Sequence, residues 1–99
     1  MNAPDQARRA EELRRAVLDF LAARQAVAFE SAVILERIIR SRILDFHPEP
    51  DEFAAALTFL ENFSPEPLIT FKRGLLGSSR FYQATSAGVL ALERGAFNP

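Results

Sequence analysis

The chain has no cysteine, no tryptophan and a single histidine among its 99 residues. Without cysteine it can form no disulfide and has no thiolate chemistry, and one histidine is too few for a closed zinc site. A chain without cysteine fits a reducing compartment. We therefore expect a cytoplasmic protein with no bound metal.

Net charge is also nearly absent, because twelve basic and thirteen acidic residues leave a formal charge of −1 at pH 7. No field of the whole molecule attracts phosphate or anionic lipid, so a nucleic-acid site must be a local patch. The first residues lack the basic start and apolar stretch of a signal peptide, and no apolar run is long enough to span a bilayer. We expect no membrane contact.

What is present is the composition of a globular domain, with 48% hydrophobic and 25% charged residues. The length suits a single domain, 1–99, with one core. Apolar residues recur with helical spacing in three segments, which predicts helices over 5–24, 32–42 and 51–62. The predicted buried stripes are Leu13, Ala16, Val17, Phe20 and Leu21; Ile34, Leu35, Ile38 and Ile39; and Phe53, Ala56, Leu57 and Leu60. Charged residues of the first helix, including Arg8 and Arg9, fall mainly on its solvent side.

The boundaries between these helices follow from local signals. Residues 26–30 suit a short extended segment, with Ser31 as the N-cap of the second helix. One continuous helix over 26–42 is the alternative, because nothing in this stretch strongly breaks a helix. Prolines 48 and 50 interrupt the chain, and Pro50 with the acids Asp51 and Glu52 suits the start of the third helix.

In the last third of the chain, the spacing of the apolar residues is no longer helical. Residues 68–73 and 80–84 are rich in β-branched and aromatic residues, and two glycines lie between them, which predicts a hairpin over 68–84. Thr85 then suits the N-cap of a last helix over 85–95, which Gly95 would end. The apolar residues of that helix are Val89, Leu90 and Leu92.

This order of elements resembles the winged helix-turn-helix superfamily. The segment Tyr82-Gln83-Ala84-Thr85-Ser86-Ala87-Gly88 is similar to the Tyr-x-x-Thr-x-x-Gly ending of many winged-helix transcription regulators. The resemblance implies an α+β, mostly helical fold with a three-helix core, a two-stranded β-hairpin wing and a short C-terminal helix. It also implies a homodimeric regulator, joined by its first or last helix, whose third helix lies in the major groove of duplex DNA.

The third helix departs from that pattern, because it contains three acids and no base. Carboxylates repel phosphates, so only Thr58 and Asn62 of this helix suit DNA contact. Basic residues lie instead on the wing and the second helix, and they are Lys72, Arg73, Arg80, Arg37 and Arg40. The leading hypothesis is therefore DNA binding mainly through the wing. The alternative is that these charges only keep exposed faces soluble.

A second hypothesis makes the chain a protein-interaction module that does not bind DNA. Its surface would be the acidic third helix, with Phe59, and the apolar wing tip, with Leu75 and Leu76. A wing that folds back onto its own domain would equally explain the two leucines. The sequence alone thus leaves open whether the partner of this chain is DNA or another protein.

A catalytic site has little support in the sequence. His47 has Asp45, Glu49 and Asp51 near it, a set that can move protons or bind a metal, but such a histidine is more often a turn residue. The glycines at 74–77 lack the lysine and hydroxyl residue that follow a phosphate-binding loop. We expect neither an enzyme nor a cofactor.

Overall fold

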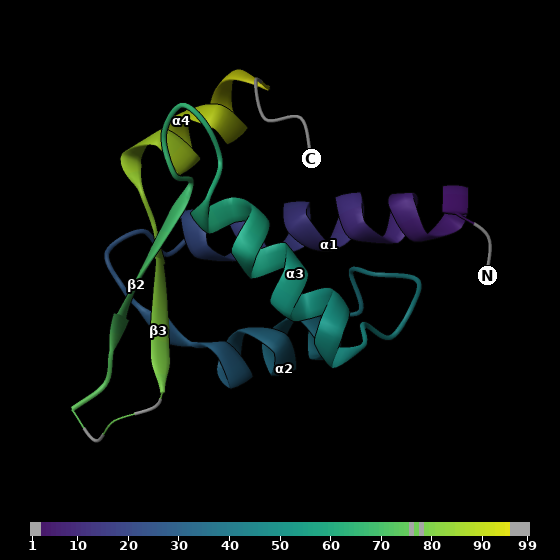
Figure 1. The fold of residues 1–99 in the computed structure, drawn as a ribbon, viewed down its shortest axis with the longest axis horizontal. Helices are drawn as coiled ribbons and strands as arrows, with labels where there is room; N and C mark the ends of the chain where they lie inside the picture. Colours follow the sequence, from purple (N-terminus) through teal and green to yellow (C-terminus); the bar gives the residue numbers. More distant parts are fainter. Residues whose placement is uncertain (1–2, 76, 78, 96–99) are drawn as a thin grey trace.

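A computed structural model describes residues 3–75, 77 and 79–95, and within them the chain forms four helices and a three-stranded antiparallel sheet (Figure 1). The predicted α+β, mostly helical class is therefore confirmed. The elements are α1 (Ala3–Ala22), β1 (Phe29–Glu30), α2 (Ser31–Ser41), α3 (Pro50–Glu61), β2 (Ile69–Arg73), β3 (Arg80–Ala84) and α4 (Ser86–Arg94).

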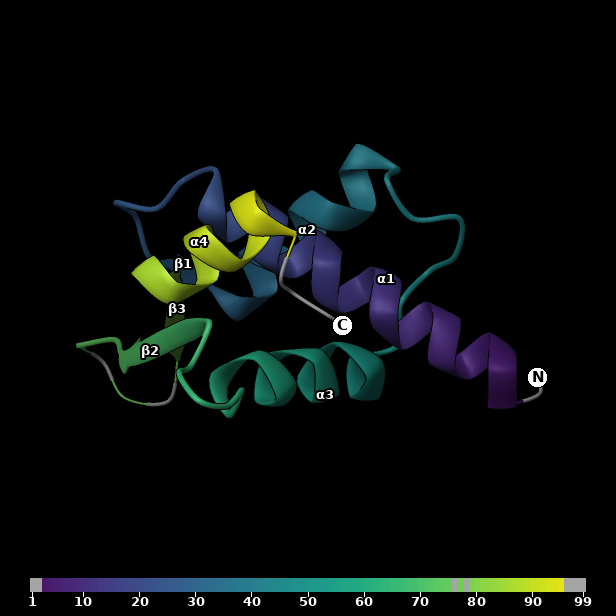
Figure 2. The same ribbon diagram turned by 90° about the horizontal axis from the view of Figure 1, so that it is seen from above.

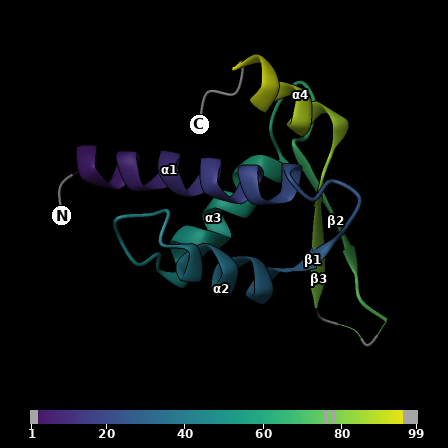
Figure 3. The same ribbon diagram turned by 180° about the vertical axis from the view of Figure 1, so that it is seen from behind.

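The long helix α1 is the centre of the molecule and packs against the other three helices and β3. From above, α3 and the hairpin of β2 and β3 lie on the same side of α1, while α2 crosses beneath α1 (Figure 2). From behind, β1 leads directly into α2 beside the hairpin (Figure 3). The strand order is β1-β3-β2, so β2 is at one edge of the sheet.

The core lies where α1, α3 and the sheet meet. The predicted stripe of the third helix is confirmed in full, since Phe53, Ala56, Leu57 and Leu60 are all buried. In α1 the buried stripe is wider than predicted, because Leu18 is fully buried beneath α4. Phe20 was predicted to be in the core, but it is half-buried and meets the edge of Phe29 at 5.1 Å.

The start of α2 corrects two expectations. A continuous helix over 26–42 is wrong, because Phe29 and Glu30 pair with Tyr82 and Phe81 of β3. Glu30 is the N-cap in place of Ser31, since strand pairing keeps Glu30 extended (φ −61°, ψ 143°) until the helix begins. The predicted buried face of α2 is narrower, with Ile34 and Ile38 buried.

Helix α3 begins as its acids and proline predict, one residue earlier than expected. Pro50 is in the first turn, and Glu49 and Glu52 form a reciprocal capping box. In that box the Glu49 N–H donates to Oε1 of Glu52 at 2.9 Å. The box satisfies backbone donors that an α-helix leaves without partners at its start.

The hairpin and the start of α4 confirm the prediction closely. The pairs run from Ile69 with Ala84 to Arg73 with Arg80. Thr85 accepts a hydrogen bond on Oγ1 from the Gly88 N–H at 3.0 Å, which is the predicted cap. The left-handed Gly95 (φ 63°) ends α4, also as predicted.

Candidate nucleic-acid interface

The register of the hairpin brings two arginines together near its turn. Arg73 and Arg80 are direct cross-strand partners, whereas Lys72 pairs with Phe81 and lies on the opposite face of the hairpin, which is also the face of Glu30. All three side chains are exposed. In the described ranges, none of the three forms an ion pair with an acid.

The orientation of Arg80 is set by an aromatic ring. Its guanidinium carbon lies 4.5 Å from the centre of Phe71, whose ring in turn lies 5.7 Å from Tyr82. Residues two apart on a strand share a face, so Phe71 and Arg73 are on the same face as Arg80. Cation–π attraction therefore holds Arg80 on the same face as the second arginine.

Like charges directly opposite on neighbouring strands repel and disfavour the folded hairpin. An anion bound between Arg73 and Arg80 removes that repulsion, and a guanidinium donates two parallel hydrogen bonds to a phosphate. The arrangement thus suits recognition of a phosphate group. The sequence predicted each of these cations, but only the register shows that two of them are paired.

Helix α3 lies on the same side of the molecule as the hairpin (Figure 2). After Pro50, the exposed residues of this helix and its C-cap are small or polar and recur with helical spacing; they are Asp51, Ala54, Ala55, Thr58 and Asn62. The two residues that the sequence selected on this helix, Thr58 and Asn62, are therefore on its open face. Asp51 belongs to that face, and the half-buried Glu61 lies at its margin, three residues after Thr58.

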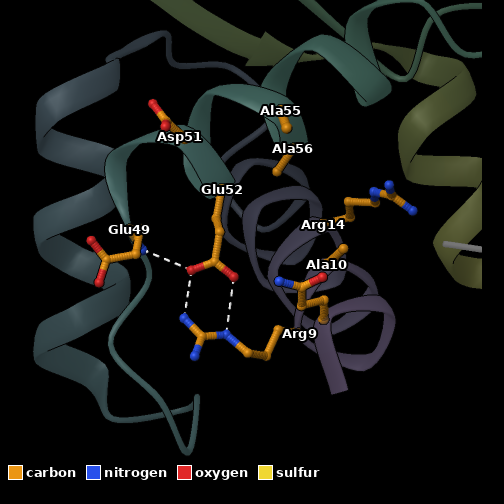
Figure 4. A pocket seen from close by; sticks show the side chains of 9 residues that line it. Arg9, Ala10, Arg14, Glu49, Asp51, Glu52, Ala55 and Ala56 are labelled. Carbon is orange, nitrogen blue, oxygen red and sulfur yellow. Dashed lines mark hydrogen bonds and ion pairs between the residues drawn. The ribbon is translucent and has the colours of Figure 1, made fainter. Parts of the chain in front are cut away.

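A second acid of α3, Glu52, is neutralised by Arg9 of α1 (Figure 4). Nε and Nη2 of Arg9 donate to the two carboxylate oxygens at 2.9 and 2.5 Å. The exposed fractions of the two side chains are only 12% and 26%. The expectation that Arg9 faces solvent is wrong, because the segment between α2 and α3 folds over α1 and its Phe46 ring lies 4.4 Å below the guanidinium.

The Arg9 hydrogen bonds, with a smaller contribution from the Glu49 N–H, hold the pKa of Glu52 below its ordinary value. A carboxylate with a lowered pKa stabilises the fold above its ordinary pKa and loses this effect as pH falls through the lowered pKa. We expect Glu52→Gln to lower the free energy of unfolding by about 1–2 kcal/mol at pH 7. In urea titrations, this difference should shrink toward about pH 3.

The exposed Glu11→Gln on α1 is the matched control, and we expect it to change stability at neither pH. An equal loss in both variants would show that the Arg9 contact contributes nothing specific.

Two of the acids near His47, Asp45 and Glu49, have other partners. Asp45 receives hydrogen bonds from Nη1 of Arg8 at 3.2 and 3.3 Å, and these raise the pKa of Arg8 further above its ordinary value. Glu49 caps α3. Across the ranges 3–75, 77 and 79–95, no group of three or more acidic or histidine side chains is arranged to hold a metal ion.

The two arginines expected from the second helix lie away from the hairpin cations. Arg40 is ion-paired with Glu36 on α2. Arg37 lines a hollow between α1 and α2, together with Asp19. Neither arginine is among the residues that line the hollow beside Lys72 and Arg73.

The apolar residues expected to bind a protein have different environments. Leu75 is fully exposed in the hairpin turn, so its side chain does not fold back onto the domain, whereas Leu76 lies outside the described residues. Phe59 is half-buried, and its ring is covered by the Arg14 guanidinium at 3.8 Å and meets the edge of Phe63 at 5.7 Å. Of the two that the structure describes, Leu75 is therefore open to a partner and Phe59 is covered.

In the part of the chain that the structure describes, no helix is both long and apolar enough to cross a membrane. Comparison with the models of known protein families, with curated proteins and with solved structures finds no match to this chain.

Proposed function

We propose that this chain is a winged-helix module that binds duplex DNA through its phosphates, with the hairpin as the main contact. The observation that carries the proposal is the direct cross-strand pair of Arg73 and Arg80, with Lys72 on the opposite face of the same hairpin; within the described residues, none of the three forms an ion pair with an acid. The order of elements from α1 to α4, with the sheet order β1-β3-β2, supports the winged-helix assignment.

The surroundings of the hairpin also favour an anionic partner. The open face of α3 has small side chains at Ala54 and Ala55, which allow a close approach, and the hydroxyl of Thr58 and the amide of Asn62 suit contacts to phosphate or base edges. The carboxylate of Glu52 is neutralised by Arg9 and therefore repels DNA less than the sequence implies.

Loss of the arginine pair tests the proposal. We expect Arg73→Gln with Arg80→Gln to weaken binding of a labelled duplex about tenfold or more at low salt, and to lower the salt slope by roughly two, because each lost phosphate contact removes about 0.9. Fluorescence anisotropy over a salt series measures both. The same variant should fold about as stably as the wild type, because relief of the like-charge repulsion offsets the lost cation–π contact between Arg80 and Phe71.

The double variant Arg37→Gln with Arg94→Gln removes the same charge from α2 and α4 and is the matched control. It should retain most of the affinity. The proposal fails if the wild-type protein does not bind duplex DNA at low salt, or if the control loses as much affinity as the hairpin variant.

One observation favours a second candidate function, which is association with a protein through the hairpin turn. Leu75 is fully exposed there, at a position that is usually polar in monomeric proteins. If this function holds, Leu75→Asp should weaken capture of the partner, and nuclease treatment should leave the complex intact. If DNA binding is the function, the capture of any partner through this turn should be lost on nuclease treatment.

A further inference from the structure

Arg14 of α1 is half-buried beside α3, with its guanidinium carbon 3.8 Å from the centre of the Phe59 ring. A guanidinium over a ring makes this contact through its face, so its N–H donors, which lie in its own plane, stay available. Within the described residues, the Arg14 side chain forms no hydrogen bond and no ion pair. These donors are therefore fixed in place and free to bind an acceptor.

Other arginines that lie over phenylalanine rings differ in how their donors are used. Arg9 donates to Glu52, and Arg24 donates to the carbonyl of the phenylalanine on which it lies, at 3.1 Å. In the described chain, Arg80 of the hairpin forms no such bond and is part of the contact proposed for DNA. Arg14 shares the arrangement of Arg80: its face is on a ring and its donors are free.

The position of Arg14 also relates it to the open face of α3. Arg14 lines a hollow of about 480 Å³ between α1 and α3, together with Asp51 and Ala55 of that face (Figure 4). The α1 wall of the hollow includes Ala10, and small side chains on both walls let a ligand group approach the guanidinium. A cation at the same hollow as Asp51 also offsets the repulsion between that acid and a phosphate.

We infer that Arg14 binds a second phosphate of the duplex, at the edge of α3 that packs on α1. This inference rests on the proposed function and adds a contact outside the hairpin. Because Phe59 holds the guanidinium in place before DNA arrives, less side-chain freedom is lost on binding. The guanidinium can then donate two parallel hydrogen bonds to the phosphate, as expected for the hairpin arginines.

Arg14→Gln tests the contact by fluorescence anisotropy with the same labelled duplex over a salt series. We expect binding about fivefold weaker at low salt. The salt slope should fall by about 0.9, the change for one lost phosphate contact. Arg24→Gln is the matched control, because it also removes a guanidinium that lies over a phenylalanine ring, but one that lines the hollow between α1 and α2. It should keep the wild-type slope.

Two further variants separate the charge of Arg14 from its cover of the Phe59 ring. Arg14→Met still covers the ring and has no charge, so it should lose as much affinity as Arg14→Gln. Arg14→Lys keeps the charge and should keep most of the salt slope. Binding of Arg14→Met with wild-type affinity and slope would overturn the inference.

Failure of this inference can be told apart from failure of the proposed function. Equal affinities and slopes for Arg14→Gln and Arg24→Gln would overturn the Arg14 contact. If the hairpin variant Arg73→Gln with Arg80→Gln still binds more weakly than the wild type in that case, the hairpin contact stands. A wild type that does not bind the duplex at low salt would overturn both.

Discussion

Replacement of Gly88 by alanine is expected to lower the free energy of unfolding by about 3 kcal/mol or more. A Cβ atom at this position would lie 2.2 Å from the carbonyl oxygen of Leu68 and 3.1 Å from Cδ1 of Leu18. The first of these atoms belongs to the backbone, and it also accepts a hydrogen bond from the Thr85 N–H at 3.1 Å. The collision can therefore be relieved only by moving α4 away from the backbone of Leu68, the residue that precedes β2.

Chemical denaturation monitored by circular dichroism measures this loss. Ser86→Ala, at an exposed position of the same helical turn, is the matched control and should stay within about 0.5 kcal/mol of the wild type. A Gly88→Ala variant as stable as that control would contradict the close packing of α4 on residue 68.

The second large effect is expected for Leu60→Ala, at about 2–5 kcal/mol. Leu60 is fully buried, and truncation leaves a cavity in addition to the lost burial of apolar surface. Its carbonyl accepts the Leu68 N–H at 3.0 Å, which joins the end of α3 to the approach of β2. The lost packing is therefore at the junction between α3 and β2, which positions the hairpin.

Leu90→Ala is the control for this truncation, because the side chain at 90 is 43% exposed and its removal leaves no closed cavity. We expect it to reduce stability by less than about 1 kcal/mol. Equal midpoints in urea for the two variants would show that position 60 is not in a packed core.

Both predictions concern one corner of the fold, and that corner sets the direction of the hairpin. The Leu68 N–H donates a hydrogen bond to the carbonyl of Leu60 in α3, and the Leu68 carbonyl accepts one from the Thr85 N–H. The same carbonyl leaves no room for a side chain at Gly88. Strand β2 begins immediately after Leu68. The position of the cations relative to the open face of α3 thus depends on contacts far from either of them.

Much of this architecture could be predicted from local sequence signals. The stripe of Phe53, Ala56, Leu57 and Leu60 predicted a buried helix face, and all four residues are buried. The cap at Thr85 was predicted as well. Such features depend on residues within a few positions of one another, so a short window of sequence contains the information.

The predictions that failed concern contacts between distant segments. Ser31 was expected to cap α2, but the pairing of Glu30 with β3 moved the cap by one residue. Arg9 was placed in solvent, although it binds Glu52, which is 43 residues away. No local pattern shows which residues a long connection will bring together.

The sequence by itself therefore determined the elements of this protein and the residue types available at its surface. It showed three basic residues on a hairpin and three acids on the third helix. Only the tertiary structure decided how those charges combine. Strand register pairs Arg73 with Arg80, and the packing of distant segments on α1 lets Arg9 neutralise Glu52. The reason is that periodicity and capping act within one element, whereas register and ion pairing depend on how separate elements meet.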